Sequence, residues 1–191
     1  MQPAVFFDRD GTLIKSVHYI NDPDKVELLD GVAQMLNDLH QAGYLCIVVS
    51  NQAGFARGLI DEQQLHAVQG RLDELLEKAG AKLDGWYFCA QPRVSDDDEA
   101  IDHPDRKPGP GMLLKAASDF EISMQHSWMV GDRLSDALAG RNAGCKATIL
   151  LSVEKSQAAL QKHPAVDFIL PDLPSVTQFI LNEDSNPQSK R

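Results

Sequence analysis

The sequence has few cysteines, few basic residues and no long apolar run. Three cysteines in 191 residues cannot form a closed set of disulfides, which favours a reducing, cytoplasmic location. Asp and Glu number 28 and Lys and Arg 18, giving a formal net charge of −10, so the chain has no sequence-independent attraction to nucleic acid or anionic lipid. No apolar run reaches the ~18 residues of a membrane span. We therefore expect neither nucleic acid nor membrane as a partner.

The length of the chain limits its domain organisation. A chain of 191 residues is long enough for one well-packed domain and too short for two comfortable ones. We expect residues 1–182 to form that domain, as a monomer, because no long heptad repeat or exposed apolar stripe is visible. Residues 183–191 are rich in Asp, Ser, Asn, Pro, Gln and Lys, and we expect this tail to be disordered.

Short apolar runs alternate with amphipathic segments. We expect strands at residues 4–7, 44–49, 85–88, 127–130, 147–151 and 166–170, and helices at 30–42, 61–79, 110–120, 134–143 and 173–181. Asp30 is expected to cap the first helix. Strands that are apolar throughout, with helices between them, predict an α/β fold: a doubly wound, mostly parallel sheet covered on both faces. Ligands of such sheets bind at the carboxyl ends of the strands.

The first polar motif, DRDGT at residues 8–12, directly follows the first expected strand. Asp8 at the strand end can attack phosphorus and form an aspartyl-phosphate. Asp10 can protonate the leaving oxygen and later deprotonate the attacking water, while Gly11 permits the tight turn between them. An acidic surface turn is the alternative. A calcium-binding EF-hand is disfavoured, because its twelfth position, which requires Glu, is Tyr19.

Two further motifs carry groups suited to phosphate. Ser50 and Asn51 follow the second expected strand, where a hydroxyl and backbone N–H groups can hold phosphate oxygens. Arg106 and Lys107 precede the helix that starts at Pro110. The Lys107 ammonium can offset the charge of a phosphoryl group and a nucleophile, and the Arg106 guanidinium can bind phosphate through two hydrogen bonds. A polar strand exit and solvated surface cations are the alternative interpretations.

The fourth motif, GDRLSD at residues 131–136, follows the fourth expected strand. Asp132 is expected to complete a Mg²⁺ site of oxygen ligands together with Asp8 and the backbone carbonyl of Asp10. Asp136, four residues later, lies on the same face of the helix start and is expected to orient a metal-bound water. Helix capping by Asp132 is the alternative.

Taken in order, DRDGT, SN, RKP and GDRLSD resemble the haloacid dehalogenase superfamily of phosphotransferases across nearly the whole chain. The resemblance implies Mg²⁺ as cofactor and a carboxylic acid, Asp10, where ion-pumping ATPases of the superfamily typically carry Thr, which points to a phosphatase. The stretches between the motifs are too short for a large cap domain. The roles implied by the resemblance are nucleophile for Asp8, general acid and base for Asp10, phosphate binding for Ser50 and Lys107, and metal binding for Asp132.

Within that superfamily, SNQAGFARG at residues 50–58 and RKPGPGM at residues 106–112 look like the corresponding segments of the heptose-1,7-bisphosphate 7-phosphatases. A small phosphorylated sugar is the substrate that this resemblance implies. Histidinol-phosphate phosphatases are similar but usually lack the Ala-Arg-Gly ending, and they stay the alternative, as does a non-catalytic phosphometabolite-binding protein. The implied substrate contacts are Ser50, Asn51, Gln52, Arg57, Arg106, Lys107 and Arg133.

One loop departs from the family pattern. Many relatives carry a zinc site, Cys-x-His followed by Cys-x-Cys, just before Arg-Lys-Pro. The matching places here hold Cys89, Gln91, His103 and Asp105. Because a structural zinc site takes four good ligands, usually Cys or His, we expect no structural zinc in this loop. Its acidic run at residues 96–99 is expected to be solvated.

Overall fold

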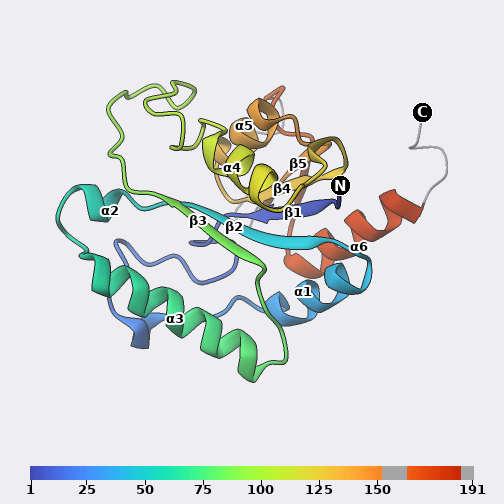
Figure 1. Cartoon of the computed structure of the whole chain (residues 1–191), viewed down its shortest axis with the longest axis horizontal. Helices are drawn as coiled ribbons and strands as arrows, with labels where there is room; N and C mark the ends of the chain where they lie inside the picture. The colour runs from blue at the N-terminus through green and yellow to red at the C-terminus, as the bar shows by residue number, and fades with distance from the viewer. Residues whose placement is uncertain (152–162, 186–191) are drawn as a thin grey trace.

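The centre of the molecule is a parallel sheet. The computed structural model describes residues 1–151 and 163–185, and within them six strands pair in the order β3-β2-β1-β4-β5-β6 (Figure 1). Every pairing is parallel, which confirms the predicted α/β fold. The strands are β1 (Ala4–Phe7), β2 (Leu45–Asn51), β3 (Gly85–Cys89), β4 (Trp128–Gly131), β5 (Ala147–Leu151) and β6 (Phe168–Leu170).

Helices cover both faces of this sheet. In Figure 1, α1, α3 and α6 lie on one side of the strands and α4 and α5 on the other. No helix in the described ranges is long and apolar enough to cross a membrane. The helices are α1 (Val32–Gln41), α2 (Ala53–Ala56), α3 (Glu62–Lys78), α4 (Gly111–Asp119), α5 (Leu134–Ala143) and α6 (Leu173–Ser185), with short 3₁₀ turns η1 (Pro23–Lys25) and η2 (Met124–His126).

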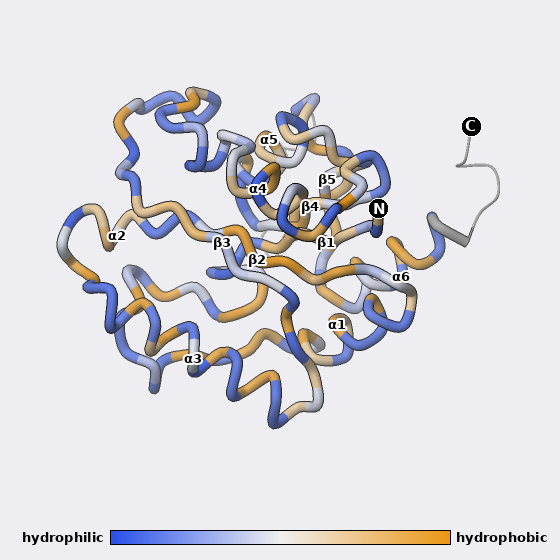
Figure 2. Tube along the Cα trace, in the orientation of Figure 1, coloured by the Kyte–Doolittle hydropathy of each residue, from blue (hydrophilic) through white to orange (hydrophobic). Residues whose placement is uncertain are grey.

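The alternation of side chains along β1 explains why its sequence is apolar throughout. Val5 and Phe7 join the core cluster under α1, α3 and α6, whereas Ala4 and Phe6 join the cluster under α4 and α5. Successive residues of a strand point to opposite faces of the sheet. Because helices cover both faces, all four side chains are fully buried. Figure 2 shows the resulting apolar band along the central strands.

The start of the first helix corrects one expectation. Asp30 was expected to cap it, but the N-cap is Gly31, with φ +85°. Asp30 lies one residue too early, since a capping side chain bonds the second or third N–H of the first turn from the N-cap position itself. An aspartate does cap α3, where the Asp61 carboxylate accepts from Gln64 N and the Gln64 side chain accepts from Asp61 N.

Most element ends differ from the expected ranges by one or two residues, and two of the differences bear on the site and on the tail. β2 continues through Ser50 and Asn51, because both residues pair with β3, opposite Phe88 and Cys89. The polar pair is therefore the end of the strand and is held rigidly. α6 continues to Ser185, so the first three residues of the tail that we expected to be disordered are helical. The rest of that tail, residues 186–191, lies outside the described residues.

Close packing of α5 on the sheet predicts opposite effects for two helical glycines. A Cβ at Gly140 would lie 2.6 Å from Met129 Cβ and 2.9 Å from Thr148 Cγ2. Overpacking of this kind typically costs about 1–3 kcal/mol, more than the ~1 kcal/mol that Ala gains over Gly in a helix. We therefore expect Gly140→Ala to lower the urea midpoint of unfolding.

The matched control is Gly70→Ala in α3, where an added Cβ meets nothing within 4 Å. There the helix propensity acts alone, and the variant should be about 0.5–1 kcal/mol more stable than the wild type. A Gly140→Ala variant as stable as Gly70→Ala would show that α5 does not pack as described.

Candidate active site

The polar motifs meet at the carboxyl edge of the sheet. Asp8 follows β1 and Asp132 follows β4, and these two strands are neighbours; the end of β2 lies on the other side of β1. The strand order reverses direction between β1 and β4, which is where a doubly wound sheet leaves a crevice. A cleft of about 870 Å³ opens there. Of the residues predicted from sequence, it is lined by Asp8, Asp10, Asn51, Gln52, Arg57, Arg106, Lys107, Asp132, Arg133 and Asp136.

Lys107 is the buried cation of this cleft. Its Nζ lies 2.7 Å from Asp8 Oδ1, 2.7 Å from the carbonyl oxygen of Val49 and 2.7 Å from Asp136 Oδ1, so all three donors of the ammonium are used. Burial alone would lower the pKa of Lys107, but the Asp136 and Asp8 carboxylates outweigh burial and raise this pKa above its ordinary value. Lys107 is therefore a fixed positive charge beside Asp8.

Two asparagines hold the main chain around Lys107. Asn51 Nδ2 donates to the Lys107 carbonyl at 2.9 Å, and Lys107 N donates to Asn51 Oδ1 at 3.0 Å. Asn142 Nδ2 donates to the Pro108 carbonyl at 2.9 Å. Both ends of the Asn51 amide are thus engaged by the backbone. Asn51 was expected to contact substrate, and in this structure it positions Lys107.

Asp136 has a different place from the one expected. Its side chain is 2% exposed; one oxygen pairs with Lys107, and the other accepts the Arg133 N–H at 3.0 Å. In this structure Asp136 therefore holds Lys107 and the start of α5 in place, and its expected role in orienting a metal-bound water stays a prediction. The N-cap of α5 is Arg133, so Asp132 does not cap this helix and its carboxylate is left for another purpose.

The carboxylate of Asp132 fits a metal ion. Carboxylate oxygens of Asp8, Asp132 and Asp136 lie within 4.8 Å of one another, and Asp132 Oδ1 is buried without a hydrogen-bond partner among the described residues. Burial first, then the Asp136 and Asp8 charges, raise the pKa of Asp132 to about 7. The Arg133 Nε lies 4.0 Å from this oxygen, too far for a hydrogen bond. A buried oxygen without a hydrogen bond among carboxylates is the environment that a hard cation such as Mg²⁺ relieves.

Gly11 makes room for this carboxylate. A Cβ at Gly11 would lie 2.4 Å from Asp132 Oδ2, a distance that no real side chain tolerates. The residue also has φ +87°, a backbone region that favours glycine. The tight turn predicted at this position is confirmed, and the structure adds that the turn must also stay bare for Asp132 to approach.

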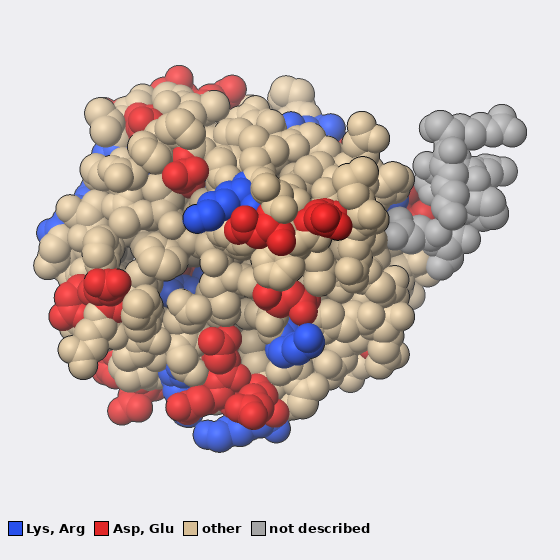
Figure 3. Space-filling model, viewed as in Figure 1, with Lys and Arg blue, Asp and Glu red and all other residues tan. Residues whose placement is uncertain are grey.

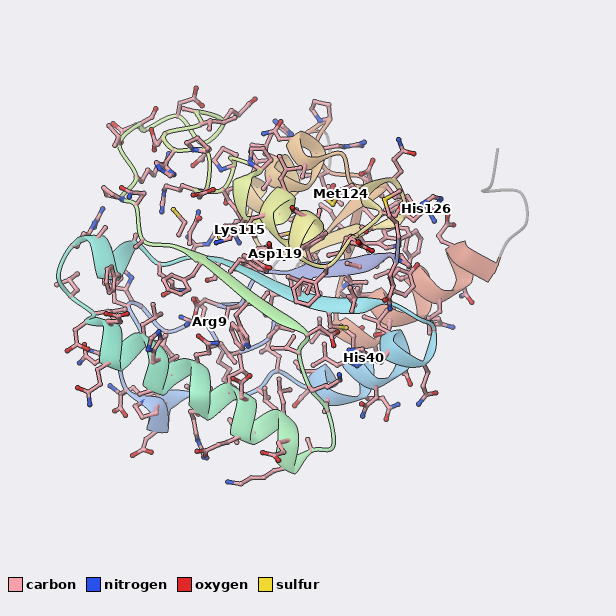
Figure 4. The ribbon with its side chains drawn as sticks, in the orientation of Figure 1. Arg9, His40, Lys115, Asp119, Met124 and His126 are labelled. Carbon is pink, nitrogen blue, oxygen red and sulfur yellow. The ribbon has the colours of Figure 1, made fainter. Side chains whose placement is uncertain are left out.

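Arg9 is a site residue that sequence reasoning missed. Its side chain is 3% exposed, and it donates to Asp10 Oδ2 at 2.9 Å, to Asp10 Oδ1 at 3.3 Å and to Gln52 Oε1 at 3.2 Å. Gln52 Nε2 in turn donates to Ser50 Oγ at 2.7 Å and to Asp10 Oδ2 at 3.2 Å. Figure 4 labels Arg9 in the interior, near the strand ends. An arginine directly after a buried strand and between two aspartates was the available signal.

The outer part of the cleft carries several guanidinium groups. Arg57 Nη1 donates to Tyr19 Oη at 2.7 Å, and Arg106 Nη1 donates to the Gln91 carbonyl at 2.9 Å. The pKa of Arg106 lies below its ordinary value, mainly because of burial and also because Arg93 and Arg57 are near. Basic and acidic side chains both line the cleft, and both are spread over the molecular face in Figure 3.

The loop between β3 and α4 is held by local hydrogen bonds. Cys89 Sγ accepts from Gln91 N at 3.4 Å, and His103 Nδ1 accepts from Asp105 N at 3.1 Å. The two oxygens of Asp102 accept from the backbone N–H groups of residues 94 and 95, at 2.8 and 2.9 Å. The four places that carry zinc ligands in many relatives therefore take part in, or border, ordinary loop contacts here.

Known proteins resemble this chain in sequence and in fold. The profile of the HAD-hydrolase-like family matches residues 105–176. The D-glycero-beta-D-manno-heptose-1,7-bisphosphate 7-phosphatase of Pasteurella multocida is 39% identical, covering 81% of this chain and 84% of its own. The D-glycero-D-manno-heptose-1,7-bisphosphate 7-phosphatase of Thermosynechococcus vestitus is 37% identical, and the match covers 94% of this chain and 95% of that protein.

A solved structure agrees with these relatives. The D,D-heptose 1,7-bisphosphate phosphatase from B. bronchiseptica, crystallised with magnesium and phosphate, superposes with a TM-score of 0.80 at 28% identity and covers 95% of this chain and 99% of that one. The chain is therefore a phosphatase of the haloacid dehalogenase superfamily, and the cleft at the sheet edge is its candidate active site. Within that superfamily, the chain belongs to the heptose-1,7-bisphosphate 7-phosphatase family.

Because three carboxylates lie close together in the site, we expect Asp132→Asn to be more stable than the wild type when no metal is bound. The pKa of Asp132 is about 7 in the folded protein and about 3.9 when unfolded. The folded state then binds more protons between these values, so the stability of the metal-free protein falls as pH rises from about 4 to about 7. At pH 8 in chelator, we expect Asp132→Asn to exceed the wild type by on the order of 1–3 kcal/mol, measured by urea unfolding.

Excess Mg²⁺ should reverse this order, because it stabilises only a folded state that can bind it. Asp24→Asn, at an exposed carboxylate of η1, is the control and should follow the wild type under both conditions. An Asp132→Asn protein that is less stable in chelator, or equally stabilised by Mg²⁺, would contradict the assignment of Asp132 as a metal ligand.

Proposed function

We propose that this phosphatase hydrolyses a phosphomonoester through an aspartyl-phosphate on Asp8, with Mg²⁺ as cofactor, and that its substrate is D-glycero-D-manno-heptose 1,7-bisphosphate, from which it removes the 7-phosphate. The contact between Lys107 Nζ and Asp8 Oδ1 carries this proposal. It sets a buried carboxylate beside a permanent positive charge at the rim of a cleft, which is the arrangement that attack on an anionic phosphoryl group requires.

Asp8 makes the first bond. One of its carboxylate oxygens attacks phosphorus in line with the leaving sugar oxygen, so that the P–O bond to Asp8 forms as the P–O bond to the sugar breaks. Lys107 stays bound to Asp8 and to Asp136, and its charge offsets part of the negative charge on the phosphoryl oxygens. Because it is already held in place, no reorganisation is needed during the reaction.

Asp10 acts as the general acid and then as the general base. It is the less buried of the two motif aspartates and faces the cleft, where it donates a proton to the leaving sugar oxygen. It then accepts a proton from the water that attacks the aspartyl-phosphate, and free phosphate leaves. The Arg9 guanidinium pairs with Asp10, and we infer that Asp10 turns away from Arg9 toward the leaving oxygen when substrate enters.

The metal would be held by Asp8, by Asp132 and by the backbone carbonyl of Asp10. Bound there, Mg²⁺ supplies positive charge that offsets the phosphoryl oxygens and the crowded carboxylates. The unpartnered oxygen of Asp132 and the bare turn at Gly11 are the features of this chain that support the assignment.

The outer guanidiniums favour a bisphosphate over a monophosphate. Arg57 and Arg106 line the cleft with the proposed catalytic residues, and guanidinium groups bind phosphate through paired hydrogen bonds. Arg93 also lines the cleft, but its guanidinium already binds Asp98 and two loop carbonyl oxygens. Histidinol phosphate, the alternative, carries an ammonium group and would need free carboxylates. Of the acidic side chains on that wall, Asp98 pairs with Arg93 and Asp102 accepts two backbone N–H groups, which makes them less available to such a group.

Replacing the nucleophile tests the mechanism. Asp8→Asn keeps the shape of the side chain and an acceptor for Lys107, but an amide cannot attack phosphorus. We expect phosphate release to fall by roughly a thousandfold or more, while the cooperative unfolding transition is retained. Asp24→Asn, exposed on η1, should keep wild-type turnover. Turnover by Asp8→Asn within tenfold of the wild type would exclude Asp8 as the nucleophile.

A substrate panel tests the specificity. With Mg²⁺ present, we expect one anomer of the heptose bisphosphate to be hydrolysed at least a hundredfold faster, in kcat/KM, than histidinol phosphate or fructose 1,6-bisphosphate. That ratio corresponds to about 2.7 kcal/mol of discrimination in the transition state. Comparable rates on all substrates would leave a phosphatase without the proposed specificity.

Arg106 offers a sharper version of this comparison. Removing a charged hydrogen bond to phosphate costs about 1.5–3 kcal/mol, so Arg106→Ala should lower kcat/KM for the bisphosphate by roughly 10–100-fold. The rate on heptose 7-phosphate, which lacks the second phosphate, should change far less. An equal loss on both substrates would place Arg106 at the transferred phosphate instead.

A further inference from the structure

A second group of possible metal ligands lies at the opposite edge of the sheet from the active site. His40 is in the last turn of α1, Cys46 lies near the start of β2, and Asp84 directly precedes β3. Ligand atoms of these three side chains lie within 4.8 Å of one another. Figure 4 labels His40 on α1, beside the chain that leads into β3. The amino ends of β2 and β3 and the end of α1 therefore converge on one point.

The contacts within this group already orient its donor atoms. His40 Nε2 lies 2.7 Å from Asp84 Oδ2, and Cys46 N donates to the same oxygen at 2.8 Å. Lys82, an exposed side chain, pairs with the other oxygen, Asp84 Oδ1, at 3.3 Å. A hydrogen bond between His40 and Asp84 explains two of the three residues as an ordinary polar pair. That hydrogen bond does not explain why the Cys46 thiol lies within 4.8 Å of the ligand atoms of His40 and Asp84.

The chemistry of the donors selects a particular kind of cation. An imidazole nitrogen, a thiolate sulfur and a carboxylate oxygen form a mixed, borderline-soft set, which suits Zn²⁺ and not Mg²⁺. The only other cluster of this kind within the described residues is the active-site group of three carboxylates, whose hard oxygens have the reverse preference. We therefore expect the His40, Cys46 and Asp84 cluster to prefer Zn²⁺ and the active-site cluster to prefer Mg²⁺.

Solvent can reach the cluster from one side. Asp84 lines a surface hollow of about 420 Å³ together with Lys82 and Trp86, while Cys46 is fully buried behind it. Of the three candidate ligands, only Asp84 lines the hollow, so an ion entering from it would meet this carboxylate first. The hollow would also supply the water that completes four ligands.

We propose that His40, Cys46 and Asp84 form a Zn²⁺ site that joins the end of α1 to the starts of β2 and β3. The site is separate from the loop at residues 89–105, where relatives bind zinc and where this chain lacks the ligands. It is also independent of the proposed hydrolysis, because it lies at the far edge of the sheet. Zinc bound there would stabilise the folded chain without taking part in turnover.

Cobalt provides the direct test, since Co²⁺ occupies zinc sites and absorbs in the near ultraviolet only when a thiolate binds it. The whole protein is titrated with Co²⁺ in saturating Mg²⁺, which keeps the active site filled. We expect a charge-transfer band that one equivalent of Zn²⁺ removes, and a rise in the temperature of unfolding with Zn²⁺. Cys46→Ser and His40→Gln should each abolish the band or weaken Co²⁺ binding at least tenfold.

Cys145→Ser is the matched control, because Cys145 is a buried cysteine of the other core cluster and should leave the band unchanged. Mg²⁺-dependent phosphate release, read in the same samples, reports whether each variant is folded. If Cys46→Ser fails to fold, the half-buried His40 decides the question alone. No band in the wild type, or a band that His40→Gln leaves with unchanged intensity and unchanged Co²⁺ affinity, would overturn the zinc site whatever the phosphatase assay shows.

Discussion

The ion pairs of Lys107 with Asp8 and Asp136 are the interaction on which the active site depends. Carboxylate oxygens of three aspartates converge within 4.8 Å at the sheet edge, and like charges at such distances cannot all stay ionised without a cation. Lys107 is nearly fully buried and pairs with two of the three carboxylates. Removing a buried ion's partner typically costs 3–5 kcal/mol, so the lysine and its aspartates act as one unit.

The sheet gives this unit its rigidity. Asp8 and Asp132 directly follow adjacent strands whose residues are buried on both faces. Asn51, which belongs to β2, binds the backbone of Lys107 through two hydrogen bonds. Asp8 and Asp132 therefore sit directly at the ends of buried strands, and Lys107 is tied to β2 through Asn51, as a site that must hold charges in place requires. The proposed outer substrate contacts, Arg57 and Arg106, lie in loops, which is where specificity can vary without disturbing the chemistry.

Much of the fold could be predicted because its signals are local. Continuous apolar runs located the strands, and polar motifs directly after them located Asp8, Ser50 and Asp132. Partners far apart in sequence could not be found this way. Spacing placed Asp136 on the same helix face as Asp132, but only the fold shows that it faces Lys107. Arg9 gave a weak signal for the same reason, since its contact with Gln52 spans 43 positions.

The decisive measurement is the chemical trapping of the phosphorylated enzyme. Enzyme and substrate are mixed, quenched in acid during the first turnovers and reduced with borohydride, which converts an acyl-phosphate to an alcohol; peptides are then mapped by mass spectrometry. Covalent catalysis by Asp8 predicts the reduced side chain at position 8 in the wild type and its absence in Asp8→Asn. Reduction at another carboxylate, or none while phosphate is being released, would contradict a covalent mechanism through Asp8.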